Sequence, residues 1–130
     1  MVKKYLAPLS VILRWGHLTT PTWQIGLDVS NPAPDTTLIS LSIPSGKKAY
    51  VYGVYIATPE ANDFYLSWVN NGVEKRYYIL FGAKGTLYFA DIIPLNEGLP
   101  ADPNTTIAIK NVNAGVGLYR TGFLVGLVEG

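Results

Sequence analysis

The chain of 130 residues contains no cysteine, and its one methionine is residue 1. Without cysteine the protein has no disulfide, no thiolate nucleophile and no zinc site built on thiolates. The fold must therefore be stabilised by packing and hydrogen bonds alone. The scarcity of oxidisable side chains favours a thermophilic source, whereas eight asparagines, which are thermolabile, argue against one.

Charged residues are also scarce, at 15% of the chain, and ten Lys and Arg nearly balance nine Asp and Glu. A formal charge of +1 provides no general attraction to nucleic acid or to an anionic membrane. No apolar run reaches the roughly 20 residues of a membrane-spanning helix. Pro8 and Arg14 interrupt the apolar stretch that follows the first two lysines, so we expect no signal peptide. Neither nucleic acid nor a membrane is an expected partner.

Groups that perform catalysis are few. His17 is the only histidine, and no second ligand follows it at a spacing typical of a metal site. No serine lies in a nucleophile motif, and "GVGLYRTG" lacks the lysine of a phosphate-binding loop. We therefore expect no enzyme, no cofactor and no metal. Five carboxylates remain as an alternative calcium cluster or acid–base pair, should folding bring them together: Asp28, Asp35, Asp63, Asp91 and Asp102.

Alternation of apolar and polar residues is abundant, and it has the two-residue period of a half-buried strand. In "WQIGLDVS", Trp23, Ile25, Leu27 and Val29 alternate with polar or small residues, and we expect these four to face the core. Further strands are predicted at residues 9–15, 36–43, 47–57, 64–69, 75–81, 86–93, 105–112 and 118–130.

The segments between these strands are rich in residues that form turns, and "NNGV" is the strongest hairpin signal. No convincing helix is present. About nine regularly spaced strands predict an all-β sandwich or barrel, in one domain that covers residues 1–130.

Aromatic residues are numerous, with three Trp, nine Tyr and four Phe. We interpret most of them as core, with Trp23 and Trp68 in the core-facing sets. An exposed aromatic platform that stacks on sugar rings is the alternative. Trp15, Tyr77 and Tyr78 are the candidate ligand-binding residues in that case.

Residues 49–57 have no polar face. One alternating set is Ala49, Val51, Gly53, Tyr55 and Ala57, and the other is Tyr50, Tyr52, Val54 and Ile56. Because the outer face of an antiparallel sandwich is normally polar, one of the two sets must be covered by another segment or another copy. We favour a homo-oligomer, a trimer or another closed form, with Val51, Gly53 and Tyr55 as the candidate interface; the reverse assignment of the two sets stays open.

Three stretches carry a resemblance to a known family: "IPSGKKAYVYGVYIAT", "FYLSWVNNGVEKRYYILF" and "PLNEGLPADPNTTIAIKNVNAGVGLYRTGFLVGLVEG". A P-x-G-K turn introduces a long V-x-G-V-x-I strand, and a P-L-x-x-G-L-P-A loop precedes a T-I-x-I strand. Over residues 36–130 this layout resembles the small jelly-roll domains of phage and archaeal-virus structural proteins. The resemblance implies an antiparallel β-sandwich of jelly-roll type with about eight to nine strands.

Members of such families are head-decoration, fibre-head or minor capsid proteins that oligomerise and have no catalytic residues. The resemblance therefore implies a non-enzymatic structural or assembly protein, located in a virion, whose partners are copies of itself and other virion proteins. A carbohydrate- or surface-binding β-sandwich that recognises surface glycans through exposed Trp and Tyr is the alternative function.

Overall fold

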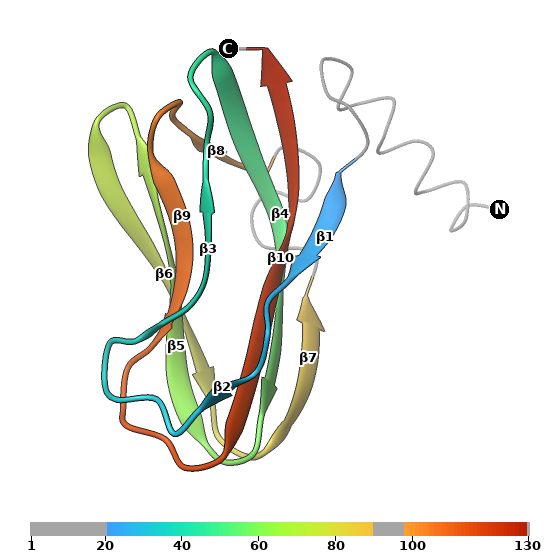
Figure 1. Cartoon of the computed structure of the whole chain (residues 1–130), viewed down its shortest axis with the longest axis vertical. Helices are drawn as coiled ribbons and strands as arrows, with labels where there is room; N and C mark the ends of the chain where they lie inside the picture. Colours follow the sequence, from blue (N-terminus) through green and yellow to red (C-terminus); the bar gives the residue numbers. More distant parts are fainter. Residues whose placement is uncertain (1–20, 90–97, 130) are drawn as a thin grey trace, which may run out of the picture.

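The computed structural model describes residues 21–89 and 98–129, and these residues form ten strands and no helix (Figure 1). The predicted all-β class is confirmed. The expected strand at residues 9–15 and the candidates Trp15, His17 and Asp91 lie outside the described residues. The strands are β1 (Thr22–Ile25), β2 (Val29–Ser30), β3 (Thr37–Ser42), β4 (Lys47–Thr58), β5 (Asn62–Asn70), β6 (Val73–Phe81), β7 (Gly85–Phe89), β8 (Leu99–Ala101), β9 (Thr106–Asn111) and β10 (Leu118–Glu129).

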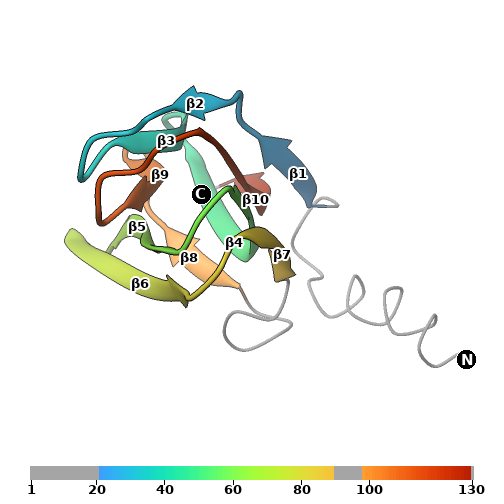
Figure 2. The same cartoon turned by 90° about the horizontal axis from the view of Figure 1, so that it is seen from below.

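Two antiparallel sheets face each other across the core, as the view along the strands shows (Figure 2). The first, here called the β4 sheet, has the order β1-β10-β4-β7, with β2 also paired to β10 and β8 to β4. The second, here called the β5 sheet, has the order β3-β9-β5-β6. The two longest strands, β4 and β10, have 12 residues each and pair with each other along most of their length.

The hairpin predicted at "NNGV" is confirmed. Asn70 pairs with Val73 across a two-residue loop, and Asn71 and Gly72 have φ values of 54° and 78°. Two positive φ values in succession define the turn that fits the twist of a β-hairpin, and Asn-Gly is the preferred sequence for it. The carboxylate of Asp102 stabilises the loop, because it accepts hydrogen bonds from the backbone N–H groups of Asn71 (3.1 Å) and Gly72 (2.9 Å).

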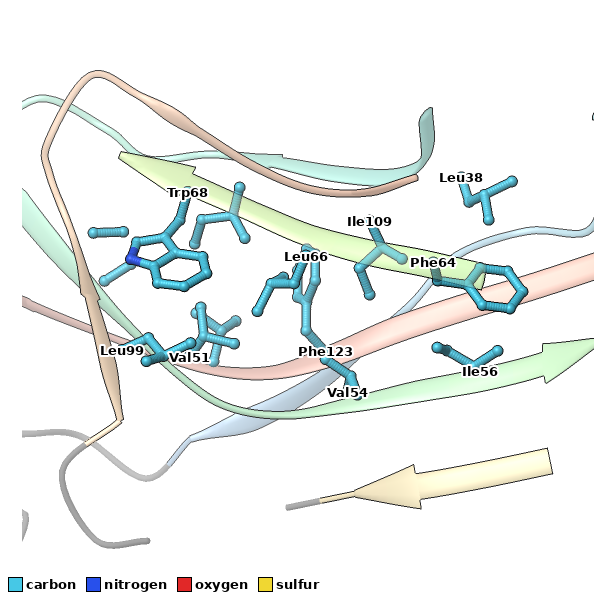
Figure 3. Packing of buried hydrophobic residues seen from close by; sticks show 14 of the residues in the cluster. Leu38, Val51, Val54, Ile56, Phe64, Leu66, Trp68, Leu99, Ile109 and Phe123 are labelled. Carbon is cyan, nitrogen blue, oxygen red and sulfur yellow. The ribbon is translucent and has the colours of Figure 1, made fainter. Parts of the chain in front are cut away.

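The core lies between the sheets and is filled by the alternating inner faces of both. Phe64, Leu66 and Trp68 of β5 point toward the β4 sheet and pack in one cluster with Val54 and Phe123 (Figure 3). Trp68 is 6% exposed, so its predicted place in the core is confirmed. Complete burial of a large apolar side chain stabilises a fold by about 1.5–3 kcal/mol, which makes this cluster the main source of stability in a chain without disulfides.

The prediction that Trp23, Ile25 and Leu27 face the core is wrong. Trp23 is 37% exposed, Ile25 is 42% exposed and Leu27 is 84% exposed. The strand register explains why, since Trp23 pairs with Leu124 and Ile25 with Gly122, both on the outer side of β10. Alternation at an edge strand shows that one face is apolar, and the pairing with β10 decides which way that face points.

The single strand predicted at residues 23–30 is also interrupted. Ile25 and Val29 are four residues apart, whereas their partners in β10, Gly122 and Tyr119, are only three residues apart. The extra residue cannot pair, so two short strands, β1 and β2, replace one long strand.

A β-bulge in β4 changes the predicted faces of residues 49–57. Leu124 pairs with Gly53 and the next residue of β10, Val125, pairs with Val51, so Tyr52 has no opposing residue in β10. Alternation restarts on the other side of the bulge. Val51 and Val54, which strict alternation assigns to opposite faces, therefore both lie in the core and are fully buried.

The bulge predicts that Val51→Lys and Val54→Lys behave alike. Each substitution places an unpaired ammonium in the core at a cost of several kcal/mol, which is comparable with the total stability of about 5–15 kcal/mol of a domain. We expect both variants to lose the cooperative thermal transition that circular dichroism detects. Tyr55→Lys, on the half-buried outer side of the same strand, is the matched control and should stay folded. A folded Val51→Lys protein would contradict the bulge register.

Candidate functional site

The outer face of the β4 sheet is made mainly of apolar side chains and glycines, with Arg120 and Lys48 toward its two ends. We call it the apolar face. It consists of Trp23, Ile25, Tyr50, Gly53, Tyr55, Leu118, Gly122, Leu124, Gly126 and Val128.

Strand pairing arranges the apolar face in rows. Trp23, Leu124 and Gly53 are successive partners across β1, β10 and β4, and Ile25, Gly122 and Tyr55 form the next row. Leu124 and Tyr55 are half-buried, whereas Trp23 and Ile25 keep more than a third of their surface in contact with solvent. Such a row of large and small side chains is suited to packing against another apolar surface.

Charged pairs lie at both ends of β10. Near the end of β10 the Nζ of Lys47 lies 2.6 Å from a carboxylate oxygen of Glu129, and near its start the Nε of Arg120 lies 2.9 Å from Asp28 Oδ1. Exposed pairs of this kind add little stability. Arg120 and Asp28 place both signs of charge at one end of the apolar face, whereas Lys47 and Glu129 have the strand parity of Ala49 and Leu127, which face the core.

An open hollow of about 530 Å³ lies where the apolar face ends. Tyr55 and Leu118 of the apolar face line it together with Lys84, Asp28 and Arg120. The described residues of the lining include no histidine and one carboxylate, which is paired with Arg120. These residues supply no acid–base pair and no activated nucleophile of the kinds that hydrolytic or transfer chemistry requires.

The structure separates the residues predicted as an interface. Gly53 and Tyr55 belong to the apolar face, but Val51 is packed inside the protomer core, because the bulge at Tyr52 turns it inward. Tyr52 itself is 2% exposed. Its ring packs against Gly98, where a Cβ atom would lie 2.8 Å from the ring, and burial raises the pKa of the Tyr52 phenol well above its usual range.

The residues predicted to bind a ligand are also separated. Tyr77 pairs with Leu66 and is packed against the core, whereas Tyr78 pairs with Tyr65 and is 53% exposed on the outer face of the β5 sheet. Neighbouring residues of a strand point to opposite sides, so the two tyrosines cannot form one binding platform.

The aspartates considered as a calcium or acid–base cluster are dispersed among the described residues. Asp28 pairs with Arg120, Asp35 accepts a hydrogen bond from the Tyr65 hydroxyl (2.6 Å), and Asp102 holds the β5–β6 hairpin. Within residues 21–89 and 98–129 no three His, Cys, Asp or Glu side chains come together as a metal site.

A buried polar network at one end of the sandwich was missed at the level of sequence. The amide of Asn62 donates to the backbone oxygen of Asn113 (2.9 Å) and to the hydroxyl of Tyr119 (3.1 Å). The Tyr119 hydroxyl donates to a carboxylate oxygen of Glu60 (2.6 Å), which also accepts from the backbone N–H of Val116 (2.6 Å). These bonds tie the β4–β5 connection to the β9–β10 connection.

Asn111 extends the network to a third connection. Its side-chain amide donates to the backbone oxygens of Ala33 and Asn113, both at 2.8 Å, and its side-chain oxygen accepts from the N–H of Thr36 (3.2 Å). Asn111 is fully buried and Asn62 is 5% exposed. An asparagine at a core-facing position of a strand is the sequence signal that points to such a network, since buried amides require partners.

No protein-family model matches the chain, and no curated protein matches it. Among the described residues there is also no helix of the length and apolar character needed to cross a membrane.

The network predicts a contribution of Glu60 to acid stability. The Tyr119 hydroxyl first, and then the Val116 N–H, hold the pKa of Glu60 below its ordinary value of 4.5. Because the pKa of Glu60 is lower in the folded protein, its contribution to stability is complete above the ordinary pKa of 4.5 and is lost as the pH falls through the lower, folded pKa. We expect Glu60→Gln to lower the urea midpoint at pH 7 and to lower it less at pH 3.

Tyr119→Phe is the matched variant, since it removes the donor and leaves the carboxylate in place. It should destabilise the fold by about 1–3 kcal/mol at pH 7, because the buried amide of Asn62 loses a partner. If the Glu60→Gln midpoint differs from wild type by the same amount at pH 7 and pH 3, the assignment of this carboxylate is wrong.

Proposed function

We propose that this chain is a non-enzymatic structural protein of jelly-roll type that assembles with copies of itself through the apolar face, as a component of a virion. The observation that carries the proposal is the difference between the outer faces of the two sheets. The apolar face is built mainly from Trp, Tyr, Leu, Ile, Val and Gly. The outer face of the β5 sheet instead carries Ser40, Ser67, Thr106, Lys110 and Glu74, and its exposed large apolar side chains, Tyr78 and Leu80, lie on the edge strand β6.

A protein that needs only to be soluble would have polar residues on both outer faces. Here the outer face of the β5 sheet is mostly polar, with exposed Tyr78 and Leu80 on its edge strand β6, whereas the centre of the outer face of the β4 sheet is apolar. Large exposed apolar surfaces on soluble proteins mark contact sites. The difference therefore supports a protein that uses one sheet for contact and leaves the other in solvent.

The strand order supports the jelly-roll type. Apart from the short strand β8, and with β1 and β2 counted as one interrupted strand, eight strands form two sheets with the orders β1-β10-β4-β7 and β3-β9-β5-β6. The first and last strands are neighbours, and the chain passes repeatedly from one sheet to the other. Eight strands in two sheets form the jelly roll of viral capsid and lectin domains. Because a fold alone does not define a function, the apolar face remains the main argument.

A second copy is the partner that suits this face best. Apolar residues occupy its centre, and charges of both signs lie at one end of it, at Arg120–Asp28. In a dimer of identical faces, the apolar centre of one copy packs against the apolar centre of the other, and the charges at its end can meet charges of the opposite sign. A strongly charged partner would meet no complementary field there.

Leu124→Lys tests the assembly. Leu124 lies in the middle of the apolar face, half-buried between Trp23 and Gly53, so a lysine there places a charge in the contact. We expect wild-type protein at micromolar concentration to sediment as a closed oligomer, and Leu124→Lys to sediment as a folded protomer with an unchanged circular dichroism spectrum. The loss of association should exceed about 100-fold, since burial of an unpaired charge costs about 3 kcal/mol or more.

Ser67→Lys is the matched control, because it introduces the same charge in a central strand on the outer face of the other sheet. It should leave the oligomer intact. A monomeric wild-type protein, or an oligomer that survives Leu124→Lys, contradicts assembly through this face. The virion component of the proposal is tested separately by the genes beside the one that encodes this chain, where a run of virion genes is expected.

A further inference from the structure

The outer face of the β5 sheet contains a hollow of about 480 Å³ that crosses the strands. We call it the cross-strand trough. The side chains that define it come from all four strands of the sheet: Ser40, Ser67, Glu74, Thr106, Ala108 and Lys110. It lies on the opposite side of the molecule from the apolar face, so a function there is independent of assembly.

Strand register explains the shape of the trough. Ser40, Ala108 and Ser67 are successive partners across β3, β9 and β5, and Arg76 of β6 continues the row. The three small side chains make a low floor. With neighbouring strands about 4.8 Å apart, four strands span roughly 14 Å, which accommodates a short chain of sugar units laid across the sheet.

An exposed aromatic side chain stands at the β6 end of the next row. The ring of Tyr78 lies 5.3 Å from that of Tyr65, and the Tyr78 hydroxyl accepts a hydrogen bond from Arg76 (3.3 Å). The guanidinium of Arg76 is in turn 4.5 Å above the ring of Tyr65. Tyr78 is 53% exposed but is oriented by both neighbours, so little rotational freedom remains for a ligand to remove.

Tyr65 is itself held in place beneath this group. It is 2% exposed, and its hydroxyl donates to Asp35. Burial, and then the hydrogen bond to Asp35, raise the pKa of Tyr65 to about 12, so the phenol remains a donor at neutral pH. The pair Tyr65 and Tyr78, which lies beside the trough and is not part of its lining, is thus anchored to the β2–β3 connection as well as to the sheet.

The charges along the trough are not balanced. Glu74 is paired with Arg76, at 3.1 Å, whereas none of the ion pairs that the described residues form includes Lys110. Lys110 lies between Thr37 and Tyr65 in the row beside the floor. A ligand that brings one carboxylate to this position gains a charge-assisted contact.

The hydrogen-bonding groups of the trough favour a sugar over a peptide. The backbone groups of β9 and β5 are used in pairing with strands on both sides, so an extended peptide finds no free strand edge inside the trough. What the floor and walls offer are hydroxyl groups of serine and threonine, which donate and accept as sugar hydroxyls do. Nucleic acid would require more than one unpaired cation.

We propose that the cross-strand trough binds a short acidic glycan, with Tyr78 stacked on the apolar face of one sugar ring, Ser40, Ser67 and Thr106 bonded to sugar hydroxyls, and Lys110 paired with a sugar carboxylate. The chain would then contact a glycan-coated surface through one sheet and copies of itself through the other.

Isothermal titration calorimetry tests this proposal. The ligands are trisaccharides and tetrasaccharides that contain glucuronate, galacturonate or sialate, and the controls are neutral chains of equal length. We expect at least one acidic chain to bind about tenfold more tightly than its neutral counterpart, and Lys110→Gln to abolish that difference. Ser67→Leu, which fills the floor without removing a packing contact, should weaken binding of both kinds of chain by more than about tenfold.

Tyr78→Ala should also weaken binding about tenfold, and its thermal transition is measured in parallel because Tyr78 supports the β5–β6 hairpin. Leu124→Lys is the control, since it should lose assembly and retain glycan binding. The proposal is overturned if no chain binds at millimolar concentration, if Ser67→Leu binds as tightly as wild type, or if a peptide or nucleic acid probe occupies the trough instead.

Discussion

The antiparallel pairing of β10 with β4 is the constraint on which both sheets depend. These two strands form the centre of the β4 sheet, and every other strand of that sheet is attached to one of them. Their inner side chains, among them Val51, Val54 and Phe123, form one wall of the core against which the β5 sheet packs. Because of the bulge at Tyr52, the set of alternate β4 residues that faces the core changes at this point, while β4 stays paired with β10.

The connections at one end of the sandwich depend on buried polar groups rather than on apolar packing. Asn62 and Asn111 occupy inner positions of β5 and β9, where an apolar residue is the rule, and each amide satisfies several backbone groups of the neighbouring loops. In a chain with no disulfide, such amides hold three connections between strands in single conformations. The Glu60–Tyr119 bond closes the same end.

The two outer faces divide the surface of the molecule into different chemistries. The β4 sheet presents aromatic and aliphatic side chains separated by glycines. The β5 sheet presents hydroxyls, a few charges and one oriented tyrosine, with exposed Leu80 on its edge strand. A sandwich keeps these surfaces on opposite sides because each sheet has only one face toward the core. Self-association and recognition of a glycan, as proposed above, therefore do not compete for residues.

The local sequence pattern determined which segments form most of the strands and the tight hairpin. Alternation located β3 to β6, β9 and β10, the Asn-Gly pair located the tight hairpin, and the absence of cysteine left packing as the source of stability. The tertiary structure alone decided which side of β1, and of β4 before its bulge, faces the core. Val51 is core because a bulge shifts the register of β4, and Trp23 is outside because its partner in β10 is Leu124. Period and turn chemistry are properties of neighbouring residues, whereas the direction of a face is set by pairing between residues about 70 to 100 positions apart, which no local pattern contains.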